Sequence, residues 1–251
     1  ATLNAFGVAG ATAPVAHAGK FGWTDKSIAY IKDNVAWPAE AGLRAALLAQ
    51  LGYEGSESIL DGDRGYWVMA GSDRCNFKRL TDFSGYEIMN ISLKPYPCCR
   101  WIHTTLDALG ELVAEHHFEP PDIERIEVFS TQSLADYFGR QDPRSFVDME
   151  FSIPCALSLK LHGIPHAAWY RPENWSTPAV LELASRVSVS LEDEYQDLYL
   201  KLGRASSRIP ARIEVTIKGG GKLAGYCDLA SGCPEKPMAS QARKAKVLDL
   251  T

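Results

Sequence analysis

The side chains best suited to chemistry in this chain lie close together, between Leu93 and Leu109. They are, in order, Lys94, Tyr96, Cys99, Arg100 and His103. Prolines on both sides of the tyrosine hold the backbone extended there and prevent a helix. Lysine and arginine are residue types that hold carboxylates, and histidine titrates near neutral pH. These residue types together indicate a site that binds an anion and transfers a proton.

A helix is predicted directly after this stretch. Ile102, Leu106, Leu109 and Val113 recur at spacings of four, three and four residues, which gives one apolar face. The N-terminus of such a helix has free N–H groups and a partial positive charge, which favour an anion such as a carboxylate. A structural interpretation stays open, in which the lysine and arginine are solvated, the cysteines fill the core and His103 lies on the helix surface.

The stretch resembles a signature of the MmgE/PrpD family, Lys-x-Tyr/Phe-Pro-x-Cys-x-x-x-His-x-x-x-Asp-Ala. In this chain the corresponding residues are Lys94, Tyr96, Pro97, Cys99, His103, Asp107 and Ala108. Three further segments resemble family motifs in the family's order, namely residues 42–55, 148–154 and 231–238. Four ordered matches make the resemblance specific.

The resemblance implies a function. Family members are cofactor-independent enzymes that act on small polycarboxylates, and they include 2-methylcitrate dehydratase, cis-aconitate decarboxylase and iminodisuccinate epimerase. They combine a large all-helical domain with a smaller α+β lid, the active site lies between the two, and they are usually homodimers. We therefore expect a lyase or isomerase that removes a proton next to a carboxylate, with no cofactor and no metal.

The resemblance also implies roles for single residues. The candidate catalytic residues are His103, as the acid/base, with Lys94 and Tyr96, and the candidate substrate-binding residues include Arg100 and Cys99. Lys94 and Arg100 would hold or polarise carboxylate oxygens. Tyr96 would donate a hydrogen bond or simply pack. Cys99 stands where some decarboxylase-like members have a histidine, so dehydratase, hydratase or isomerase chemistry is expected before decarboxylation.

Lys32 is a further candidate for substrate binding, because some family members have a basic residue in this neighbourhood. Those of the decarboxylase type carry a Lys-x-x-His pattern, which residues 31–34 do not reproduce. A solvated lysine is the alternative interpretation.

The elements that must position these residues indicate an α+β fold. Helices are predicted over residues 38–51, 102–117, 148–161, 177–185 and 239–248. Strands are predicted over residues 86–93, 123–129 and 187–191, followed by a hairpin over 211–230. Residues 130–146 are predicted to form a polar loop, and the leucines of 38–51 to form a buried face.

The predicted domains are a partial helical domain over residues 1–85, a small mixed α+β lid domain over 86–230, and a return segment to the helical domain over 231–251. The resemblance covers only the latter part of the family chain. We therefore expect a homo- or hetero-oligomer in which a second chain supplies the missing helical half, as in a split or truncated enzyme. The alternative is a non-catalytic subunit or a binding or structural protein of the same fold.

The composition of the chain argues against several classes of protein. A net charge of −5 argues against a nucleic-acid surface, which needs clustered Lys and Arg. No apolar run approaches the roughly 20 residues of a membrane span. The six cysteines show no Cys-x-x-Cys spacing, which argues against zinc and against a redox pair, and a cytoplasmic protein is expected.

Overall fold

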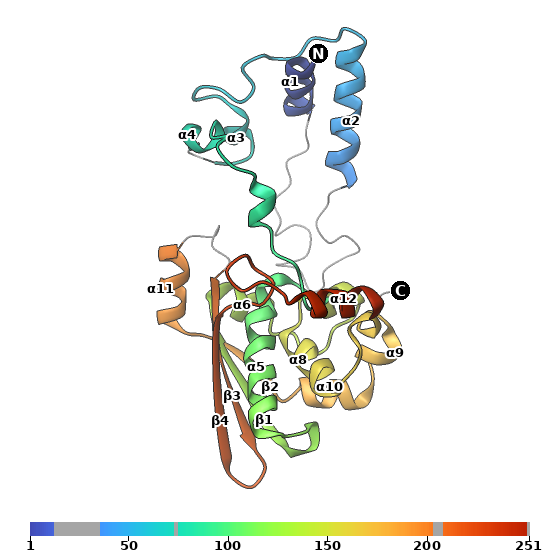
Figure 1. Cartoon of the computed structure of the whole chain (residues 1–251), viewed down its shortest axis with the longest axis vertical. Helices are drawn as coiled ribbons and strands as arrows, with labels where there is room; N and C mark the ends of the chain where they lie inside the picture. The colour runs from blue at the N-terminus through green and yellow to red at the C-terminus, as the bar shows by residue number, and fades with distance from the viewer. Residues whose placement is uncertain (13–35, 73–74, 203–207, 250–251) are drawn as a thin grey trace. The chain divides into compact units, whose positions relative to one another are not determined.

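The computed structural model describes residues 1–12, 36–72, 75–202 and 208–249. Two compact units divide between Gly85 and Tyr86. Figure 1 shows the whole chain with its elements labelled. Each unit is described by itself below. Among the helices of the described ranges, none is both long and apolar enough to cross a bilayer.

The first unit contains four helices in its described residues. Their bounds are α1 Thr2–Thr12, α2 Ala36–Gln50, α3 Tyr66–Met69 and α4 Phe77–Leu80. Helix α1 packs against α2 and also against the loop at Gly55. A Cβ atom on Gly7 would lie 2.4 Å from the Ser56 carbonyl oxygen, so this close approach of two backbones requires glycine.

The helix predicted over 38–51 is confirmed as α2, but its predicted buried face is wrong. Leu43, Leu47 and Leu51 are 64%, 52% and 84% exposed, whereas Ala45 and Ala49 are buried. Helix α2 contacts α1, and its buried residues are these two alanines, so the leucines are left on the outside of the unit.

The second unit is built on a four-stranded sheet of order β2-β1-β3-β4. The strand bounds are β1 Ile123–Ser130, β2 Val187–Leu191, β3 Arg208–Ile217 and β4 Gly221–Leu229. β1 is parallel to β2 and antiparallel to β3, and β3 is antiparallel to β4. This mixed sheet with helices confirms the α+β fold class, the predicted strands at 123–129 and 187–191, and the predicted hairpin.

Helix α5, His103–His116, lies along the sheet and contacts β3 and β4 (Figure 1). Gly225 of β4 allows this contact, because a Cβ atom there would lie 3.0 Å from Leu112 Cγ and 3.2 Å from the Ala108 carbonyl oxygen. Short 3-10 turns, η3 Arg100–Ile102 and η4 Pro120–Asp122, lie just before α5 and shortly after it. The sheet thus fixes the helix that carries the signature motif.

The remaining helices pack around this centre. They are α6 Gln132–Tyr137, α7 Phe146–Glu150, α8 Ile153–Leu161, α9 Pro172–Trp175, α10 Pro178–Ala184, α11 Asp193–Leu202 and α12 Ser240–Asp249, with the 3-10 turns η2 Glu87–Asn90 and η5 His166–Ala168. Helix α8 contacts α5 and α10. The helices predicted at 102–117, 177–185 and 239–248 are confirmed, and α11 lies in a segment for which no element was predicted.

Three local predictions need correction. The strand predicted over 86–93 is instead η2 followed by extended chain, because no neighbouring strand pairs with it among the described residues. The loop predicted over 130–146 contains α6, whose Leu134 is buried together with the following Phe138. The helix predicted over 148–161 is divided into α7 and α8, because Ser152 caps the second helix by accepting a hydrogen bond from the Cys155 N–H group.

Candidate active site

The signature motif is held at the N-terminal end of α5 by three distant segments. The Leu93 N–H group donates to the Gly232 carbonyl (2.8 Å), and the Cys99 N–H group donates to the Glu150 carbonyl (2.8 Å). The Lys246 ammonium of α12 donates to the Lys94 carbonyl (2.5 Å). The side chain of Lys94 is exposed, so a ligand could reach it.

Arg100 joins the motif to the segment that follows β4. Its guanidinium donates to the carbonyls of Ser231 (2.6 Å) and Ala230 (3.0 Å). The same group donates to Nδ1 of His103 at 3.1 Å. Burial lowers the pKa of Arg100 from its ordinary value, which leaves the guanidinium charged. Arg100 therefore orients the histidine as well as the chain.

His103 is fully buried. Burial first, and then the charge of Arg100, lower its pKa to about 3, while a weaker interaction with the Cys98 backbone acts in the opposite direction. The imidazole is therefore neutral near pH 7. Because a guanidinium can only donate, Nδ1 accepts and the ring proton lies on Nε2. Nε2 is buried and has no hydrogen-bond partner among the described residues.

Tyr96 is buried in a short chain of hydrogen bonds. Its hydroxyl donates to Oδ1 of Asp107 (2.8 Å), and the Lys160 ammonium donates to the hydroxyl oxygen (3.3 Å). Burial and the Asp107 carboxylate raise the pKa of Tyr96, so the hydroxyl keeps its proton. Oδ2 of Asp107 accepts from the Ser231 N–H group at 2.6 Å. This network links α5, α8 and the chain after β4.

The structure adds residues that sequence reasoning missed as site candidates. Lys160 lies over the Tyr96 ring, 4.7 Å from its centroid, and a Cβ atom on Gly110 would lie 3.2 Å from the lysine Nζ. The His166 ring meets the Tyr96 ring edge-on, with the centroids 5.4 Å apart. Burial is the main cause that lowers the pKa of both Lys160 and His166. One signal was available in the sequence, since Lys160 is the only charged residue of α8.

Cations outnumber carboxylates around this end of α5. The cations are Lys94, Arg100, Lys160, Lys236 and Lys246, and the carboxylates are Asp107, Glu111 and Asp249. Lys236 lies 4.0 Å from Asp107 and 3.7 Å from Glu111. Burial is the main cause that lowers the pKa of both histidines, and the nearby cations lower it further. The arrangement suits an anion that supplies the missing negative charge.

The two remaining predicted site residues are placed differently. Cys99 is half-buried at the start of η3, next to the main network. Lys32 lies outside the described residues. Among the described residues, no three or more His, Cys, Asp or Glu side chains lie so that they could hold a metal ion.

The fold and the site define an α+β domain with a cation-rich polar network at one helix end. The family model of the MmgE/PrpD C-terminal domain matches residues 96–251, which is more than half of the chain. The chain therefore belongs to the MmgE/PrpD family, which includes lyases of the dehydratase type. No curated protein matches the chain.

Proposed function

We propose that this chain is part of a cofactor-independent lyase or isomerase that removes a proton next to a carboxylate of a small polycarboxylate, by dehydratase or hydratase chemistry. The observation that carries the proposal is the excess of cations around a neutral, buried histidine at the N-terminal end of α5. A polycarboxylate would supply the negative charge that this end of the helix lacks.

The proposed division of roles follows the geometry. Lys94, which is exposed, holds a substrate carboxylate. His103 presents its Nε2–H group, which lacks a partner among the described residues, and donates from it to an oxygen of the substrate. It accepts the substrate proton at Nε2 only in the other tautomer, in which Nδ1 carries the ring proton and the hydrogen bond from Arg100 is broken. Arg100 keeps that nitrogen protonated in the resting state through its hydrogen bond to Nδ1. A bound carboxylate near the ring would raise the pKa of His103 towards neutrality, so substrate binding itself would prepare the histidine for proton transfer.

Tyr96, Cys99 and Lys32 keep subordinate roles in the proposal. Tyr96 supports the site by its bond to Asp107 and could donate to a substrate only after that bond is broken. Cys99 would border the substrate without holding a charge. Lys32 would be a second cation for a carboxylate.

We also propose that the chain works in a homo- or hetero-oligomer whose second chain supplies further helices to the site, in the cytoplasm. The support is the apolar surface of the first unit, where Leu43, Leu47, Leu51 and Phe83 are all more than half exposed. Monomeric soluble proteins rarely expose such side chains in groups. The native mass of the protein from its own cell, with every chain in the peak identified, tests this part.

The experiment for the reaction is proton exchange with solvent. The protein, with every copurifying chain, is incubated in D₂O with small di- and tricarboxylates, and proton NMR follows the C–H groups next to the carboxylates. We expect exchange in at least one compound and a loss of about 10²- to 10⁴-fold in Lys94→Met. Lys201→Met, on α11 and exposed, is the matched control and should leave exchange unchanged. Exchange in no compound, or equal exchange in Lys94→Met, contradicts the proposal.

A second candidate function is supported by one observation. His103 has no exposed surface, and the polar groups of Arg100 and Tyr96 bond to other parts of the chain. These features also suit a non-catalytic subunit in which the motif is purely structural. The exchange experiment separates the two, because a structural motif would give no exchange in the complete complex.

A further inference from the structure

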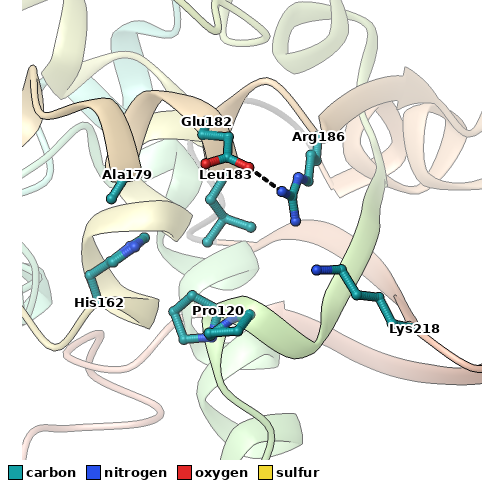
Figure 2. Close-up of a pocket in the computed structure, with 8 residues that line it drawn as sticks. Pro120, His162, Ala179, Glu182, Leu183, Arg186 and Lys218 are labelled. Carbon is teal, nitrogen blue, oxygen red and sulfur yellow. Dashed lines mark hydrogen bonds and ion pairs between the residues drawn. The ribbon is translucent and has the colours of Figure 1, made fainter.

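A pocket of about 300 Å³ lies at the other end of α5 (Figure 2). It is bordered by Pro120 of η4, by His162, which follows α8, by Leu183 and Arg186 at the end of α10, and by Lys218 after β3. Helix α5 has 14 residues, and at 1.5 Å per residue it separates this pocket from the candidate active site by about 21 Å. The pocket is therefore a separate place in the unit.

One ion pair in the pocket is already satisfied. Arg186 pairs with Glu182 one helical turn earlier, and its Nη1 donates to the Ile123 carbonyl at 2.8 Å. Figure 2 shows the pair at the rim, with the dashed line between the two side chains. The carboxylate offsets the charge of the guanidinium, so this pair adds little net charge to the pocket.

Lys218 supplies the net positive charge. Its backbone N–H group donates to the Asp122 carbonyl at 2.8 Å, which fixes the residue at the end of β3. The ammonium has no hydrogen bond or ion pair to any residue within the described ranges. Figure 2 shows the side chain reaching from the strand end into the space between Pro120 and Arg186. A single cation in this position suits a single anionic group.

His162 provides a polar group on another side of the pocket. Its Nδ1 lies 2.8 Å from the Ser158 carbonyl, which can only accept, so Nδ1 carries a proton. Nε2 is then the nitrogen that remains for a ligand. It accepts a hydrogen bond when the ring is neutral and donates one when the ring is protonated.

The rest of the wall is apolar. Pro120 and its neighbour Pro121 form one side, and Leu183, only 3% exposed, forms part of another. A polyanion would lose solvation against these surfaces, and Lys218 could compensate only one of its charges. Glu182 would in addition repel a second negative charge.

We propose that this pocket binds a small monocarboxylate with a short apolar body. The carboxylate pairs with Lys218, and the apolar body packs against Pro120 and Leu183. The volume lies at the lower end of the range for ligand sites, which favours a small ligand. The ligand class differs from the polycarboxylate of the proposed reaction, so the pocket is a second, independent site on the same unit.

Butyrate is the probe for the test. Its binding to the full chain is measured by isothermal titration calorimetry and by NMR chemical-shift changes. We expect saturable binding of butyrate, and about tenfold weaker binding by Lys218→Met, the loss of one charge-assisted hydrogen bond. Ala179→Phe, at the rim of the pocket, fills the space with apolar volume and should abolish binding while leaving Lys218 in place. Lys201→Met is the matched control and should bind as the wild type does.

Three results would overturn the proposal. They are no saturable binding of butyrate, equal affinity in Lys218→Met, or phosphate and succinate binding as tightly as butyrate. The last result would make the pocket a general anion site. As a further check on charge, Glu182→Gln should raise the affinity for succinate, since it removes the repelling carboxylate, and an unchanged affinity would contradict the selectivity that we propose. Circular dichroism melting of each variant shows whether it is folded.

Discussion

The two ends of α5 hold their charged side chains in different ways. At the N-terminal end, Arg100 and Asp107 bond to the backbone of a segment more than 120 residues away in sequence. At the C-terminal end, Glu182 and Arg186 pair within one short segment, and Lys218 ends a strand without a described partner for its ammonium. One end is a network across the unit, and the other is a local pair beside an open pocket.

The difference separates structural from binding roles. Buried charged groups that bond to distant segments hold those segments together, so their removal should lower the free energy of unfolding. Exposed charged groups around a pocket contribute little to the free energy of unfolding and remain available to bind a ligand. The comparison predicts large stability effects at the N-terminal end and small ones at the C-terminal end.

The largest effect is expected for Asp107→Ala. The carboxylate is buried and accepts from the Tyr96 hydroxyl and the Ser231 N–H group, so its loss leaves both donors without their partner. We expect a loss of about 3–5 kcal/mol in the free energy of unfolding, measured in urea. Glu111→Ala, one turn later on the same helix and 66% exposed, is the control, with an expected change within about 0.5 kcal/mol. Similar losses in both variants would break the comparison.

Arg100→Ala comes next. It removes the donors to the Ser231 and Ala230 carbonyls and the orienting bond to His103. We expect a loss of about 2–3 kcal/mol in urea unfolding. Arg243→Ala on α12, an exposed arginine, should change stability by less than about 0.5 kcal/mol. If Arg100→Ala were as stable as the wild type, the hydrogen bonds of Arg100 to the segment after β4 would not contribute to stability.

The pH dependence of stability tests the burial of His103. Its pKa is about 3 in the folded state and about 6.5 when unfolded, so between these values the unfolded state binds more protons. Stability contributed by the neutral ring is therefore complete above about pH 6.5 and falls as the pH decreases towards 3, by up to about 1.4 kcal/mol per pH unit. His103→Gln should remove this part of the slope between pH 6 and 4.

The control for the pH experiment is Met89→Gln in η2, where the side chain is 75% exposed and has no titratable group. This variant should keep the wild-type slope. Equal slopes in the wild type and in His103→Gln would show that the histidine is reached by solvent in the folded state.

The smallest effect is expected for Glu182→Gln. The carboxylate is 67% exposed and pairs with Arg186 on the surface, so the loss should be below about 1 kcal/mol in urea unfolding. A loss above 2 kcal/mol would mean that the pocket at this end is part of the structural framework, and the two ends of α5 would then be alike.

Much of the second unit could be predicted from local pattern. The alternation in Ile123–Phe129 predicted β1, and the apolar spacing from Ile102 predicted α5. The burial of His103 was not predictable in this way. The first two turns of α5 are buried on all sides, including Thr104, Thr105 and Asp107, because chain from elsewhere covers them. The apolar periodicity of the sequence predicts burial of one helix face only, so it does not show that other segments cover the remaining faces.

The wrong prediction for α2 and the failure to identify Lys160 have the same cause. The exposed leucines of α2 follow from close packing through Ala45 and Ala49, which depends on the partner helix α1. Lys160 belongs to the Tyr96 network because α8 packs against α5, and the two residues are 64 positions apart. Residue type indicated the neighbourhood of the site, whereas the partners were set by tertiary packing that the sequence pattern does not contain.

The bond between Arg100 and the Ser231 carbonyl spans 131 positions in the chain. During synthesis, the motif at the start of α5 leaves the ribosome long before the segment that fastens it, at about 5–20 residues per second. Contacts of such long sequence separation form slowly, since the chain entropy of closing the loop must be overcome first. We therefore expect the network at this helix end to form late in folding, after the segment that follows β4 has been synthesised.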